Sequence, residues 1–88
     1  MDFRYDARKL DPKIVSFLQS KELPKNPREY GTWRLEIETS DPHRLIKDYL
    51  RNDGKIINGK VETYFPLAEI LQLTSDEKAP IKYVKMLD

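Results

Sequence analysis

The sequence contains no cysteine, one histidine and three widely separated glycines. Without thiols there is no disulfide, no thiolate metal site and no cysteine nucleophile. The single histidine, His43, falls in the first turn of a predicted helix, and no serine stands in a Gly-x-Ser-x-Gly turn. Gly31, Gly54 and Gly59 are too far apart to form a phosphate-binding loop. We therefore expect a protein that is not an enzyme and holds no metal or cofactor.

The chain also lacks long apolar runs and an excess of charge of one sign. No apolar run approaches the roughly 18 residues that a membrane span needs, and the first residues do not have the basic-then-apolar layout of a signal peptide. Sixteen Lys and Arg against fifteen Asp and Glu give a formal net charge of +1, so no overall field directs the protein to nucleic acid or membranes. We expect a single domain over residues 1–88 that stays in the cytoplasm.

Two Asp-Pro pairs, at residues 11–12 and 41–42, predict the starts of two helices. An Asp side chain caps free backbone N–H groups, and proline at the first helical position has no N–H to lose. Apolar residues recur at helical spacing after each pair, as far as about Lys21 in the first helix and until Gly54 in the second. A third, shorter helix is expected over residues 67–73. Each helix has one apolar face to bury.

Strand patterns fill the spaces between these helices. Apolar and charged residues alternate over 33–39, and Asn-Gly at 58–59 suits the two-residue turn of a hairpin over 55–64. A last strand is expected over 81–86 and a first one over 3–10. The order β-α-β-α-β-β-α-β predicts an α+β fold with a mixed, largely antiparallel sheet and two main helices packed on one face. The predicted core contains Trp33, Leu35, Ile37, Leu45, Tyr49, Leu50, Val61, Phe65, Ile70 and Leu71.

Basic residues recur on the second helix, opposite its apolar stripe, and in the hairpin. Residues 45–71 resemble the helix-wing-helix part of excisionase-type DNA-binding domains, with Tyr-Phe-Pro-Leu at 64–67 after the wing, although a strand at 33–39 stands where that family requires a helix. The resemblance implies a helix in a groove of DNA and a wing on its backbone. Nucleic-acid binding through helix 41–53 and hairpin 55–64 is therefore our alternative prediction. Its expected contacts are Arg44, Lys47, Arg51, Lys55, Lys60 and, for base stacking, Tyr64.

Aromatic residues and a sheet edge favour a protein partner. Five tyrosines and one tryptophan are many for a chain of this size, and such side chains are the usual anchors of protein interfaces. Lysines on the strand over 81–86 either protect a sheet edge or flank a pairing site. We expect a small non-enzymatic protein-interaction module, such as an accessory subunit, adaptor or inhibitor, and a homodimer through a sheet edge stays open. The residues expected at the interface are Tyr30, Tyr83, Lys82 and Lys85.

Overall fold

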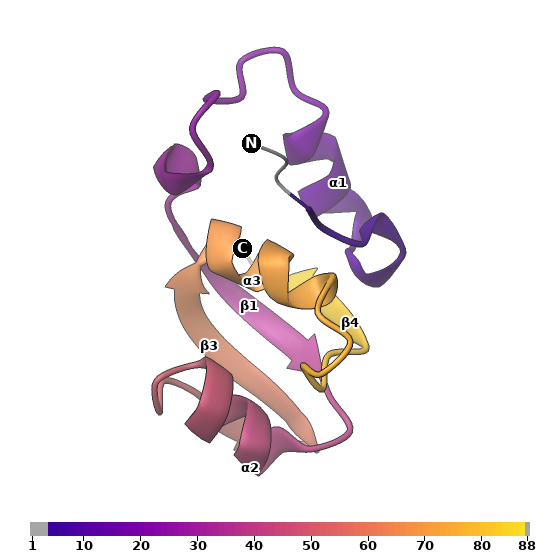
Figure 1. Ribbon diagram of the computed structural model, residues 1–88, viewed down its shortest axis with the longest axis vertical. Helices are drawn as coiled ribbons and strands as arrows, with labels where there is room; N and C mark the ends of the chain where they lie inside the picture. Colours follow the sequence, from indigo (N-terminus) through magenta and orange to yellow (C-terminus); the bar gives the residue numbers. More distant parts are fainter. Residues whose placement is uncertain (1–3, 88) are drawn as a thin grey trace.

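A four-stranded antiparallel sheet organises the part of the chain that the computed structural model describes, residues 4–87 (Figure 1). Its strands are β1 (Thr32–Glu38), β2 (Lys55–Ile57), β3 (Lys60–Pro66) and β4 (Tyr83–Met86), in the spatial order β2-β3-β1-β4. The helices are α1 (Pro12–Leu18), α2 (Pro42–Arg44), which continues into the π-helix η3 (Leu45–Tyr49), and α3 (Leu67–Thr74), with 3-10 turns η1 (Ala7–Lys9) and η2 (Pro27–Tyr30). The predicted α+β class is confirmed. From β1 onward, the order β-α-β-β-α-β and the strand neighbours are those of the ferredoxin-like topology.

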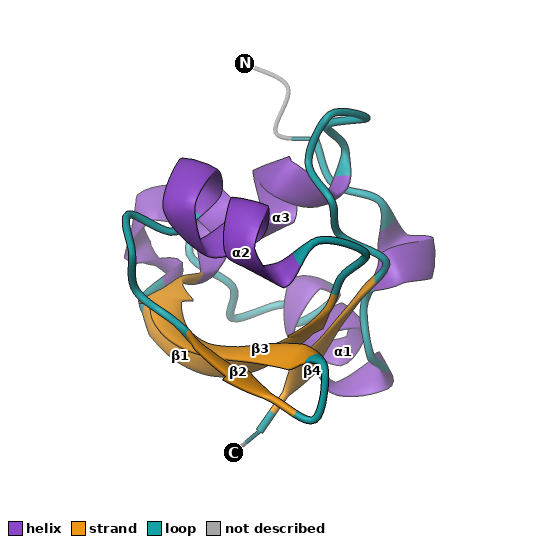
Figure 2. Ribbon diagram, turned by 90° about the horizontal axis from the view of Figure 1, so that it is seen from below, coloured by secondary structure: helices purple, strands orange, loops and turns teal. Residues whose placement is uncertain are grey.

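The alternation of residues in β1 and β3 gives the sheet one apolar face. Leu35 and Ile37 on β1 lie opposite Thr63 and Val61 on β3, and all four side chains are buried. Helices α2 and α3 lie over this face (Figure 2), whereas α1 packs against β4. We call the opposite face, which carries the intervening charged residues of β1 and β3, the open face.

Eight of the ten predicted core residues are buried, and Trp33 and Tyr49 are half-buried against them. The π-helical turn explains how the second helix contributes two fully buried leucines. The N–H of Leu50 donates to the carbonyl of Leu45, five residues earlier, at 3.1 Å, so both side chains reach the core. The remaining buried apolar residues are Leu10, Ile14, Leu67, Ala79, Ile81 and Val84.

The predicted first strand is wrong. Residue 3 lies outside the described residues, and Ala7–Lys9 form a 3-10 turn because the Asp6 carboxylate caps it, accepting the N–H of Arg8 at 3.0 Å. Hydrogen bonds from the side chain and the backbone N–H of Arg8 hold the pKa of Asp6 below its ordinary value. Among residues 4–10, Leu10 alone joins the sheet, through an isolated parallel bridge to Val84.

The ends of three other predicted elements differ from the structure. Helix α1 ends at Leu18, where the C-cap residue Gln19 donates to carbonyls of the last turn, rather than near residue 21. Regular structure of the second helix ends at Tyr49, and the chain then turns through residues with positive φ, 51° at Arg51 and 64° at Asn52. The last strand begins at Tyr83 rather than at residue 81.

Candidate functional site

The two edges of the sheet differ in whether the chain itself covers them. At β4, the N–H of Asp11 donates to the carbonyl of Val84 at 3.0 Å, and the N–H of Met86 donates to Oδ2 of Asp11 at 2.6 Å. The other oxygen of this buried carboxylate accepts the N–H of Ile14 at 3.0 Å and so caps α1. Asp11 therefore closes the outer edge of β4 while it starts the helix beside it.

At the other edge, no described segment pairs with the outer side of β2. The turn that closes the hairpin has positive φ at both central residues, 52° at Asn58 and 79° at Gly59, as the tight two-residue turn requires. In such a hairpin the flanking residues, Ile57 and Lys60, exchange both ladder hydrogen bonds. The N–H and C=O of the next residue, Ile56, consequently point away from β3, where another strand could pair with them.

Two of the three side chains of this edge strand are apolar and exposed. Ile56 is 42% exposed and Ile57 is 46% exposed, and they project on opposite faces of the sheet. We call β2 with these two side chains the β2 edge. Sequence reasoning missed it, although three-residue β2 has two consecutive isoleucines, and alternation allows only one of them to face the core.

Ion pairs neutralise most charges on the open face. Both Nε and Nη2 of Arg34 donate to Oε1 of Glu62, at 3.0 and 2.8 Å, and Nζ of Lys60 lies 3.6 Å from Oε1 of Glu36. Lys55 lies opposite Glu62 in the strand register but forms no ion pair with any described residue.

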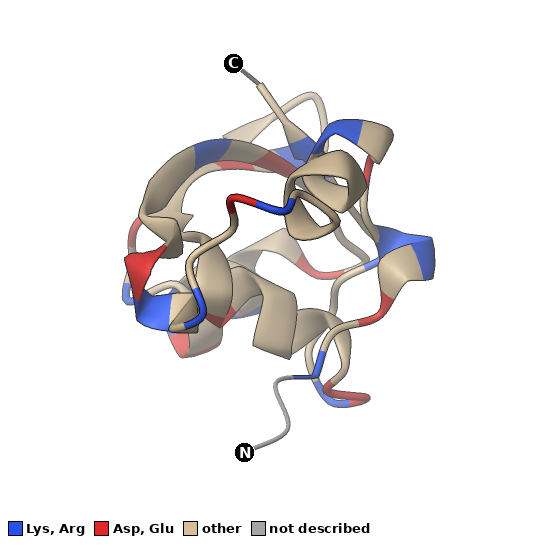
Figure 3. Ribbon diagram, turned by 90° about the horizontal axis from the view of Figure 1, so that it is seen from above, with Lys and Arg blue, Asp and Glu red and all other residues tan. Residues whose placement is uncertain are grey.

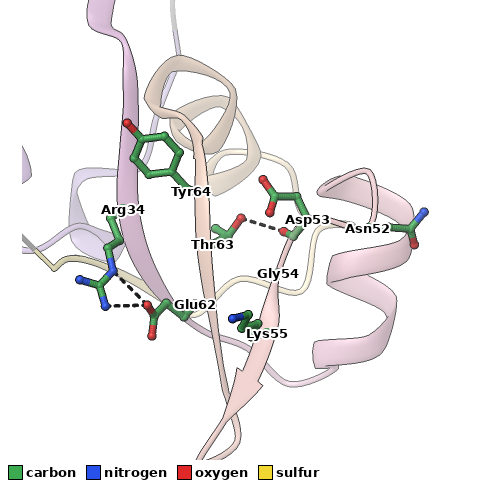
Figure 4. Close-up of a pocket in the computed structure, with 8 residues that line it drawn as sticks. All are labelled: Arg34, Asn52, Asp53, Gly54, Lys55, Glu62, Thr63 and Tyr64. Carbon is green, nitrogen blue, oxygen red and sulfur yellow. Dashed lines mark hydrogen bonds and ion pairs between the residues drawn. The ribbon is translucent and has the colours of Figure 1, made fainter.

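A shallow hollow of about 390 Å³ lies beside Lys55 on this face (Figure 4). Among its lining residues, Thr63 donates its hydroxyl to the carbonyl of Asp53 at 2.7 Å. Tyr64 lines the hollow and is 62% exposed. The hollow contains two cations and two carboxylates. Its lining residues are Arg34, Asn52, Asp53, Gly54, Lys55, Glu62, Thr63 and Tyr64.

The structure divides the predicted nucleic-acid surface between the two faces of the sheet. Arg44 and Arg51 belong to the helical face, where Arg44 pairs with Asp48 at 3.8 Å and donates to the carbonyl of Lys78. Arg51 pairs with Glu69 on α3 at 2.9 Å, and its guanidinium lies 4.8 Å from the centre of the Phe65 ring. Lys47 is exposed on η3 of the same face, whereas Lys55, Lys60 and Tyr64 project from the open face.

Basic and acidic segments alternate around the ribbon in Figure 3. Because they are divided between the two faces of the sheet, the six predicted contacts do not form one basic surface.

The residues predicted for protein interaction are also separated. Tyr30 is half-buried, and its ring meets Phe17 edge-on at 5.5 Å, while its carbonyl accepts Nε1 of Trp33 at 2.8 Å. This aromatic cluster anchors the loop before β1. The other three residues lie at or next to β4, at the edge of the sheet away from β2. Lys82 and Lys85 are exposed, and Tyr83 is half-buried.

No protein family, curated protein or solved structure matches the chain. Among residues 4–87 there is no group of three or more His, Asp or Glu side chains that could hold a metal ion. In the same residues no helix has the length and apolar character needed to cross a membrane.

Proposed function

We propose that the protein is a small non-enzymatic interaction module that binds another protein through the β2 edge, as an accessory subunit, adaptor or inhibitor. The contrast between the two edges supports this proposal most directly. The β4 edge is occupied by Asp11, whereas the N–H and C=O of Ile56 at the β2 edge pair with no described segment and stand beside the exposed side chains of Ile56 and Ile57. Addition of a strand from a partner uses this combination of main-chain hydrogen bonds and alternating side-chain contacts.

The energies indicate that the partner also reaches beyond β2. Burying the exposed parts of Ile56 and Ile57 contributes about 1 kcal/mol each, because full burial of such a side chain is worth about 1.5–3 kcal/mol. Two backbone hydrogen bonds add about 1 kcal/mol each. Association costs about 4–15 kcal/mol. We therefore expect the three paired residues to fix the register of the partner. Contacts on the neighbouring open face, including Tyr64, supply the remaining favourable free energy of binding.

Replacement of Ile56 by proline tests this edge selectively. Proline has no N–H, and the N–H of Ile56 points outward, so Ile56→Pro removes a donor to the partner without removing a bond to β3. Tagged wild-type protein should capture a stoichiometric partner from its native host. Ile56→Pro should lose that partner, whereas the matched variant Ile56→Val, which retains the N–H and the apolar side chain, should keep it. Capture that is equal for both variants would overturn the proposal, provided that circular dichroism shows both folded.

Nucleic-acid binding is the second candidate, and the exposed ring of Tyr64 on β3 is the observation that favours it. A base can stack on such a ring beside the Arg34 guanidinium. Against it, Glu36 and Glu62 lie on the same face and pair with the nearest cations. Fluorescence anisotropy with labelled DNA and RNA tests it. Micromolar binding that falls steeply with salt and is lost in Tyr64→Ala would replace the protein-binding proposal.

A further inference from the structure

We infer that the segment that pairs with the β2 edge is an extended, acidic-apolar strand of another protein, with a carboxylate opposite Lys55 and apolar side chains opposite Ile56 and Ile57. This inference rests on the proposed function and deepens it, because it names the chemistry of the partner.

Lys55 is a cation of the β2 edge with no ion-pair partner among the described residues. Its neighbour toward the inside of the sheet, Glu62, is already bound twice by Arg34. Lys60 is likewise occupied by Glu36 at 3.6 Å. Asp53 lines the same hollow as Lys55, but the two form no ion pair. The next position beside Lys55 on the open face belongs to an added strand. A carboxylate there would be the cross-strand partner that the ammonium group lacks within the described chain.

The hollow next to Lys55 limits how much negative charge the partner carries. Asp53 and Glu62 are part of its lining (Figure 4). Because Arg34 pairs with Glu62, the other charges in the lining are Lys55 and Asp53, and the hollow offers no net positive charge to a polyanion. The site therefore suits a segment with isolated carboxylates between apolar residues rather than a phosphate backbone.

A second copy of this chain fits the same edge poorly. In an antiparallel pair of β2 strands centred on Ile56, Lys55 of each copy lies opposite Ile57 of the other. The two Lys55 side chains then become diagonal neighbours on one face, about 7–8 Å apart, with no carboxylate between them. Like charges at this spacing disfavour the homodimer, so the charge pattern selects a different, acidic chain.

Titration of the ¹⁵N-labelled full chain with two short peptides tests the inference by NMR. The first peptide, acetyl-Thr-Val-Ile-Glu-Thr-amide, places Val, Ile and Glu opposite Ile57, Ile56 and Lys55 in the antiparallel register. The second replaces Glu by Lys. Both are added to millimolar concentration, where weak binding is measurable. We expect shifts centred on the Ile56 amide, with the acidic peptide binding about threefold or more tightly than the basic one.

Two charge-reversal variants complete the test. Lys55→Glu should reverse the preference, so that the basic peptide binds more tightly. Lys85→Glu makes the same change on β4, where Asp11 covers the edge, and should leave the preference unchanged. Equal binding of both peptides or shifts centred elsewhere would overturn the inference. A five-residue peptide supplies only part of the partner's contacts, so if neither peptide causes a shift the captured partner decides, and capture that Lys55→Glu leaves unchanged overturns the inference.

The two proposals fail differently. A captured partner that is lost in Ile56→Pro but indifferent to Lys55→Glu would overturn the acidic strand and leave the interaction module standing. A captured partner that is indifferent to Ile56→Pro would overturn the module itself.

Discussion

Asp11 and Met86, 75 residues apart in the chain, are joined by a 2.6 Å hydrogen bond from the backbone N–H of Met86 to the Asp11 carboxylate. The same carboxylate caps α1 through Ile14. One buried side chain thus satisfies a helix start and a strand edge together. Because this closes β4, the β2 edge is left as the place where the sheet can be extended.

Removal of the Asp11 carboxylate should lower the stability of the fold. Asp11→Ala leaves the buried N–H of Ile14 and the part-buried N–H of Met86 without partners, and we expect it to lower the free energy of unfolding by about 2–4 kcal/mol. Asp41 is the matched control, because it caps α2 through Arg44 at 3.2 Å but is exposed. Asp41→Ala should cost only about 0.5–1 kcal/mol. Urea unfolding measures both, and equal losses would contradict the double role of Asp11.

A side chain at Gly54 would crowd the residues packed against it. A Cβ atom there would lie 3.0 Å from Cγ1 of Val61 and 3.1 Å from Cγ1 of Ile46, both in the packed layer between η3 and β3. We expect Gly54→Ala to cost about 1–3 kcal/mol through overpacking. Adding Ile46→Ala, which removes one of the two contacts, should make the second substitution cheaper than it is in the wild type. Additive effects in thermal unfolding would show that the close approach is relieved in another way.

Trp33 reports on the aromatic cluster that anchors the loop before β1. Its ring meets Phe17 of α1 edge-on at 4.7 Å, and its indole N–H is bound by the Tyr30 carbonyl. Phe17→Ala should cost about 2–4 kcal/mol, since the ring is only partly buried. Because Trp33 is the only tryptophan, its fluorescence should also shift to longer wavelength. Unchanged emission would mean that Phe17 does not shield the indole.

Sequence reasoning found the elements whose signals are local. The Asp-Pro caps, the Asn-Gly turn and the alternation in β1 each require only neighbouring residues, and all three are confirmed. The conformation of residues 4–10 depends on contacts with β4 and Thr74, which lie far along the chain. The strand predicted over residues 3–10 is wrong for that reason. Which sheet edge stays open depends on the same long-range contacts. The interface predicted from the sequence therefore included Lys82 and Lys85 beside β4 and left out Ile56 and Ile57.

Amide hydrogen exchange, measured residue by residue with and without the captured partner, tests the central claim most directly. In the free protein the Ile56 amide should exchange rapidly, because it has no acceptor, while the Met86 amide should be protected by Asp11. In the complex the Ile56 amide should become protected and that of Met86 should stay as it was. An Ile56 amide that exchanges as fast in the complex as in the free protein would contradict the account.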